Sequence, residues 1–148
     1  MRYRLLSFLT LLLGIALYVL YRPEPMQWTR CVHHMGWGDR LCRLQHWAIL
    51  VYDPGEFVRC SLPDGCWSAS YVLLVHSLTA GASRSTRLLC ASFIPLLGSL
   101  TELGQAQHLL SGYFDPFDLL CYLLPLIIYT LLLLCSKTYP QPRKRGSS

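Results

Sequence analysis

The chain has 148 residues, of which 53% are hydrophobic and 14% are charged, and its formal net charge is +5. An average soluble domain carries roughly 25% charged residues, so this composition argues against an ordinary soluble globule. The length is that of one domain and leaves no room for a membrane part together with a separate soluble enzyme. The apolar residues lie in long runs separated by polar stretches, which predicts a single membrane domain over residues 1–148.

Four apolar runs predict four transmembrane helices and therefore an all-α membrane protein. The runs cover about residues 5–21, 66–82, 88–104 and 119–135. Each is long enough to cross a hydrocarbon core of about 30 Å. The first run follows two arginines and is not followed by a small-residue cleavage site, so we expect an uncleaved signal anchor. The second run contains His76 and several Ser and Thr residues, and we expect its helix to be the most enclosed by the others.

The distribution of basic residues predicts the orientation. Outside the long loop, the basic residues lie before the first run, between the second and third runs (Arg84 and Arg87), and in the tail over 136–148. The connection between the third and fourth runs carries Asp115 and Asp118 and no Lys or Arg. By the positive-inside rule, both termini are then cytoplasmic and the loop over 22–65 is extracytoplasmic. Because topology accounts for the net charge, and aromatic and basic residues do not alternate, we expect no nucleic-acid partner.

The loop over 22–65 contains several Pro and Gly residues, so we expect much of it to be irregular. Within it Leu41, Leu44, Ala48 and Val51 recur at helical spacing, which is compatible with a short helix on the outer membrane surface. An ordinary loop folded over the bundle is an equally good interpretation.

Seven cysteines divide between the apolar runs and the loop. Those within the runs are most simply small buried side chains. The four that fall outside the membrane can form two disulfides in three different pairings: Cys31, Cys42, Cys60 and Cys66. Histidines stand near Cys31 and Cys42, but the spacing matches no common zinc pattern, so we expect neither a metal nor another cofactor.

Acidic residues gather where the runs are predicted to reach the outer face. Glu102 is expected to lie still within the hydrocarbon, where a carboxyl group costs at least about 2.5 kcal/mol and should face the interior of the bundle. Gln105, one helical turn later, would lie on the same face and could hydrogen-bond to Glu102 or to a shared ligand. The topology brings Asp64, Asp115 and Asp118 to the same end. These five residues are the candidate ligand-binding residues, and no residue is assigned a catalytic role.

The three aspartates also have a structural interpretation. Asp115 followed by Pro116 fits an N-cap and first helical residue, with Asp118 in the first turn. Asp64 lies in a Pro-Asp-Gly turn sequence and could cap the second run. The nearest basic residues expected to balance the acidic ones are Arg59 and His108.

One sequence pattern resembles a known family. Glu102-x-x-Gln105, a Gly-containing turn, and then Asp115-x-x-Asp118 at the start of the last run resemble the signature of VanZ-like membrane proteins. The segment from Ser61 to Gly65 is similar to that of small bacterial proteins of this type, so the resemblance covers about residues 61–134. Where that family commonly has Arg, Asn and Gly, this chain has Gly112-Tyr113, Tyr122 and Pro125. The resemblance implies the architecture, a bacterial inner membrane location and an association with glycopeptide resistance.

These observations predict a non-enzymatic envelope protein that binds a lipid headgroup, a cell-wall precursor or another envelope protein through the acidic residues. The alternative is an intramembrane enzyme acting on a lipid-linked or phosphorylated substrate, with Glu102 and Asp115 as an acid-base pair or metal ligands. The sequence contains no hydrolase nucleophile motif or phosphate loop that would favour this alternative. A small oligomeric transporter and an immunity protein are further alternatives.

Overall fold

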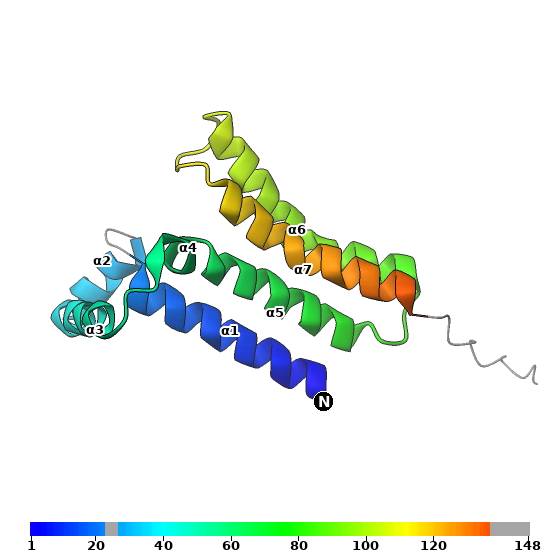
Figure 1. Ribbon diagram of the computed structural model, residues 1–148, viewed down its shortest axis with the longest axis horizontal. Helices are drawn as coiled ribbons and strands as arrows, with labels where there is room; N and C mark the ends of the chain where they lie inside the picture. Colours follow the sequence, from blue (N-terminus) through cyan, green and yellow to red (C-terminus); the bar gives the residue numbers. More distant parts are fainter. Residues whose placement is uncertain (23–26, 137–148) are drawn as a thin grey trace, which may run out of the picture.

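The computed structural model describes residues 1–22 and 27–136, and the regular secondary structure of this part is entirely helical, without strands. The prediction of an all-α protein is therefore confirmed. Three of its helices are long and apolar enough to cross a membrane: α1 (Arg2–Tyr21), α6 (Arg84–Ala106) and α7 (Pro116–Cys135). A shorter helix, α5 (Leu62–Leu78), lies between α1 and the α6–α7 pair (Figure 1).

The four longest helices alternate in direction along the bundle (Figure 1). As a result, the ends of α1 and α6 lie with the beginnings of α5 and α7, and we call this the acidic end of the bundle. The beginning of α1 and the end of α7 lie at the opposite end, which we call the basic end. The tail expected to be basic and cytoplasmic falls almost wholly outside the described residues, because the description ends at Ser136.

The segment expected to be largely irregular is instead mostly helical. It forms α2 (Gln27–His34), α3 (Gly38–Val51) and α4 (Gly55–Cys60). The expectation was wrong because the Pro and Gly residues here mark helix boundaries: Pro54 is the N-cap of α4, and Pro63 lies in the first turn of α5.

Of the two interpretations of residues 41–51, the helix is confirmed. Helix α3 crosses the end of α1, where the side-chain amide of Gln45 donates a 2.8 Å hydrogen bond to the carbonyl oxygen of Val19. Ala48 is buried, whereas Leu44 and Val51 are exposed, so the apolar face of the helix is only partly covered.

Helix α5 is joined to each of its three long neighbours by a hydroxyl group. On the side facing α1, the hydroxyl of Ser70 donates to the carbonyl oxygen of Ser7, and that of Ser7 donates to the carbonyl oxygen of Ser70, both at 2.8 Å. Ser68 donates to the carbonyl oxygen of Tyr122 on α7 at 2.7 Å, and Tyr71 donates to that of Cys90 on α6 at 2.7 Å. Small hydroxyl-bearing residues let helices approach closely and pair their polar groups within a membrane. The second apolar run is thus the enclosed one, as expected.

The apolar core occupies the half of the bundle nearer the basic end. It consists of Val72 and Val75 of α5, Ala91 of α6, and Tyr129 and Leu133 of α7. Ala91 is fully buried, so α6 comes close to its neighbours at this point.

The outward faces of the long helices are strongly apolar. They expose Leu5, Phe8 and Leu12 on α1, Leu89, Phe93 and Leu100 on α6, and Leu124, Ile128 and Leu131 on α7. An apolar surface that covers several helices is unfavourable in water but is the normal boundary with lipid. Together with the three helices of sufficient length, this surface indicates a membrane protein.

The boundaries of α5 and α6 differ from the sequence prediction. Helix α5 begins and ends one turn before the predicted run, so residues 79–82 form a turn. Arg84 and Arg87, which were expected in a loop, lie in the first turn of α6. The reason is the N-cap Ser83, whose hydroxyl oxygen accepts a 3.2 Å hydrogen bond from the backbone N–H of Thr86 and so starts the helix earlier.

The close approach of α1 to α5 depends on Gly14. A Cβ atom at this buried position would lie 2.8 Å from ring atoms of Trp67 on α5. We expect Gly14→Ala to lower the stability of the purified protein by about 1–3 kcal/mol, the usual cost of overpacking. Gly81, which is exposed and has no atom within 4 Å of an added Cβ, provides the matched Gly81→Ala control. Thermal unfolding in detergent measures both variants, and equal midpoints would contradict the proposed close packing.

Candidate functional site

Three buried carboxyl groups from three helices come together at the acidic end. Asp64 lies in the first turn of α5, Glu102 in the last turns of α6, and Asp118 in the first turn of α7. Their residues are 5%, 6% and 9% exposed. Their charges are near enough to act on one another. We call these three residues the carboxyl cluster.

Asp64 has a polar neighbour from each of two other segments, Arg22 after α1 and Tyr122 on α7. Nη1 of Arg22, at the end of α1, lies 3.9 Å from its carboxylate oxygen Oδ2. The hydroxyl of Tyr122 on α7 lies close enough to the Asp64 carboxylate for the two groups to interact. The guanidinium of Arg22 also lies over the ring of Tyr18, 5.0 Å from its centroid. Asp64 therefore links α5 to both α1 and α7.

Glu102 connects α6 to the beginning of α7. Its carboxylate oxygen Oε2 accepts a hydrogen bond of 3.4 Å from the backbone N–H of Asp115. The side chain of Asp115 accepts a 2.8 Å hydrogen bond from the backbone N–H of Phe117, so Asp115 is the N-cap of α7 as predicted. The two acidic motifs of the sequence, which contain Glu102 and Asp115, thus meet at this point. Asp115 also caps α7.

Asp118 differs from the other two carboxyl groups because one of its oxygens is both fully buried and unpaired. Its Oδ1 atom is fully buried and has no hydrogen-bond partner in the described part of the chain. At the same end, the hydroxyl oxygen of Ser61, the N-cap residue of α5, is also buried and unpaired. Nε of Arg59 in α4 is likewise buried and unpaired. Since buried polar atoms in folded proteins are nearly always hydrogen-bonded, these atoms at one end are candidate ligand contacts.

Gln105 does not join the carboxyl cluster as expected. Among the described residues, no hydrogen bond connects it to Glu102; its side-chain amide instead lies beside Gly112 in the turn after α6. A Cβ atom at Gly112 would lie 2.7 Å from the amide carbon of Gln105, so the glycine makes room for this side chain.

The basic residue that faces the cluster is also not one of those expected. Arg59 forms a 2.8 Å ion pair with the exposed Asp53, and His108 is exposed in the turn after α6. Arg22 takes their place. It was overlooked because it was counted only as a loop charge, although it directly follows the first apolar run and so belongs at the same end as the acidic residues.

Tyr122 is a second residue that sequence reasoning missed as a site residue. Its ring lies directly on Gly98 of α6, where an added Cβ atom would come within 2.5 Å of ring atom Cδ1. The absence of a side chain at Gly98 therefore lets the tyrosine lie between α6 and α7 with its hydroxyl at Asp64. The signal in the sequence was the spacing, because Tyr122 follows Asp118 by one helical turn.

Burial changes the ionisation of Cys60, which lies in α4 at this end. It raises the pKa of the thiol, and the Arg22 guanidinium opposes this effect. Cys60 is therefore an uncharged thiol at neutral pH.

The cysteines expected as disulfide partners form no disulfide in the part of the chain that the structure describes. Cys31, Cys60 and Cys66 remain thiols, and Sγ of Cys42 lies 4.0 Å from Nε2 of His33. Within the described residues, no group of three or more His, Cys, Asp or Glu side chains is arranged to hold a metal ion.

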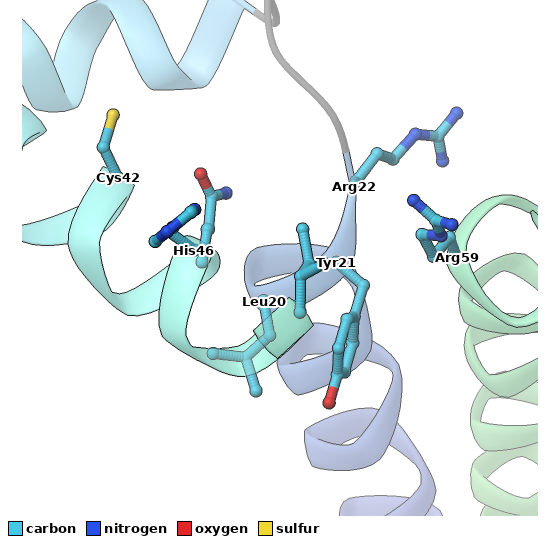
Figure 2. A pocket seen from close by; sticks show the side chains of 8 residues that line it. Leu20, Tyr21, Arg22, Cys42, His46 and Arg59 are labelled. Atoms are coloured by element: carbon cyan, nitrogen blue, oxygen red, sulfur yellow. The ribbon is translucent and has the colours of Figure 1, made fainter. Parts of the chain in front are cut away.

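A hollow of about 310 Å³ lies next to the cluster, on the other side of Arg22. Figure 2 shows its lining, with Cys42 and His46 of α3 on one side and Arg22 and Arg59 on the other, around the end of α1. Arg22 lines this hollow and is also paired with Asp64, so one guanidinium belongs to both features.

No protein-family model, curated protein or solved structure matches the chain. The arrangement therefore has to be interpreted from its own chemistry. Three carboxyl groups face one guanidinium, and one carboxylate oxygen is unpaired, so the site offers hydrogen-bond acceptors and excess negative charge. Such a site is suited to a group that carries several N–H donors.

Proposed function

We propose that the chain is a non-enzymatic membrane protein of the bacterial envelope whose acidic end binds a ligand. The ligand would be a lipid headgroup, a cell-wall precursor or another envelope protein. The observation that carries this proposal is the unpaired, fully buried Oδ1 atom of Asp118 among three mutually repelling carboxyl groups. Burying several carboxyl groups costs free energy, and a bound positive group that pairs with them would offset this cost.

The proposal includes membership of the VanZ-like family. Membership is supported by the contact between the two halves of the sequence motif, where the Glu102 carboxylate accepts a hydrogen bond from the backbone N–H of Asp115. The position at which the family has Asn is occupied by Tyr122, which also supplies a polar group to the same end. Under this proposal the acidic end is the functional region that the chain shares with that family. The chain would then also share the family's association with resistance to cell-wall antibiotics.

We also propose that α5 is a fourth span and that both termini face the cytoplasm of a bacterial inner membrane. At 17 residues α5 is about 26 Å long, which is close to the thickness of the hydrocarbon core. Its central place among α1, α6 and α7 would shield its polar groups from lipid. The acidic end, with α2, α3 and α4, would then be extracytoplasmic.

Fusion reporters test this topology in bacterial cells. Fusions after Ser136 and in the turn at Gly81 should be active as cytoplasmic fluorescent proteins, and fusions in the turn at Gly112 as exported alkaline phosphatase. If α5 does not cross the membrane, the reporter at Gly81 will give the extracytoplasmic result.

The role of the carboxyl cluster is tested by complementation of a deletion strain of the native host. We expect Glu102→Gln to lose most of the wild-type effect on susceptibility to glycopeptides and other cell-wall antibiotics, because it removes a buried charge from the cluster. Glu56→Gln, a change of the same kind at an exposed position, should complement fully. Membrane levels of all three proteins are compared by immunoblot. Full complementation by Glu102→Gln at equal abundance would contradict the proposed role.

A further inference from the structure

An apolar groove follows the carboxyl cluster along the same pair of helices. It lies between α5 and α7 and has a volume of about 250 Å³. Its lining includes Ala69 and Leu73 of α5 and Leu124, Ile128 and Leu132 of α7. From Leu124 to Leu132 the groove extends about 12 Å along the helix axis. The small side chain of Ala69 leaves space that a larger residue would fill.

The positions of the cluster and the groove match the order of groups in a lipid. Asp64 and Asp118 stand in the first turns of α5 and α7, at the end of the bundle. The groove begins about one and a half turns further along each helix, at Ala69 and Leu124. A lipid in the adjoining leaflet likewise has its headgroup at the membrane surface and its hydrocarbon chains directed inward.

The charge of the acidic end defines the headgroup. Three carboxyl groups face the single guanidinium of Arg22, so the cluster complements a positively charged group. A primary ammonium carries one positive charge and three N–H donors and no acceptor. It could therefore donate to the unpaired Oδ1 of Asp118 and to a second carboxylate at the same time.

We propose that the ligand of the carboxyl cluster is a membrane lipid whose headgroup carries a primary amine, with one of its hydrocarbon chains in the α5–α7 groove. The ammonium donates to Asp118 and to one other carboxylate of the carboxyl cluster, and the chain lies against Ala69 and Ile128. This inference rests on the proposed function and narrows it from several ligands to one chemical class.

Native mass spectrometry of the full-length protein in detergent tests the proposal. The probes are phosphatidylethanolamine and phosphatidylcholine with identical acyl chains; both are zwitterionic, and only the first carries a primary amine with N–H donors. We expect the wild type to bind the amine-bearing lipid at least about tenfold more tightly. Asp118→Asn should remove most of this preference.

The groove is tested by a matched pair of tryptophan substitutions on α7. Ile127 and Ile128 are adjacent and similarly exposed, at 48% and 50%, but only Ile128 lines the groove. Ile128→Trp should weaken binding of both lipids several-fold, whereas Ile127→Trp should bind as the wild type does. Ala69→Phe, which fills the groove from α5, provides a second variant if Ile128→Trp fails to fold.

The outcomes separate this inference from the proposed function. Equal binding of the two lipids by the wild type would overturn the proposal that the ligand carries a primary amine. If Asp118→Asn changes lipid binding and the groove variants do not, the hydrocarbon chain does not lie in the α5–α7 groove. The carboxyl cluster would then be a site for the headgroup alone. If wild type and Asp118→Asn bind lipids identically and Glu102→Gln still complements fully, the proposed function fails as well.

Discussion

Hydrogen bonding of α5 to its neighbours is the constraint on which the rest of the bundle depends. Its hydroxyl groups donate to backbone carbonyl oxygens of α1, α6 and α7, through Ser70, Tyr71 and Ser68 respectively. Buried between helices, such groups have no water to pair with, so they hold the helices at a fixed rotation and relative position. That rotation turns Asp64 toward Arg22 and Tyr122, and the carboxyl cluster is a consequence of it.

The two ends of the bundle are built on different chemistry. Near the basic end, Val72, Ala91 and Tyr129 belong to an apolar core that needs no ligand to be stable. At the acidic end, carboxyl groups are buried against one another with a single guanidinium nearby. Such an arrangement costs stability unless it is protonated or bound, which is typical of groups kept for function rather than for folding.

Some parts of the site could be predicted from the sequence and others could not. The capping role of Asp115 follows from its neighbours alone, because an N-cap is a local interaction with the next few backbone amides. The burial of Glu102 also follows, since an intramembrane carboxyl must face the bundle. Arg22 and Tyr122 were missed because their roles depend on contacts with helices that are distant in sequence.

The sequence by itself determined the helical class, the approximate places of the long helices and the gathering of acidic residues at one end. These features follow from hydrophobic runs, charge distribution and local capping, which act over a few residues. The tertiary structure alone decided which acidic side chains face one another, that Gln105 stays apart, and that Arg22 is the opposing charge. Those outcomes depend on the rotation of each helix about its axis, which close contacts such as Gly14 with Trp67 and Gly98 with Tyr122 set in three dimensions.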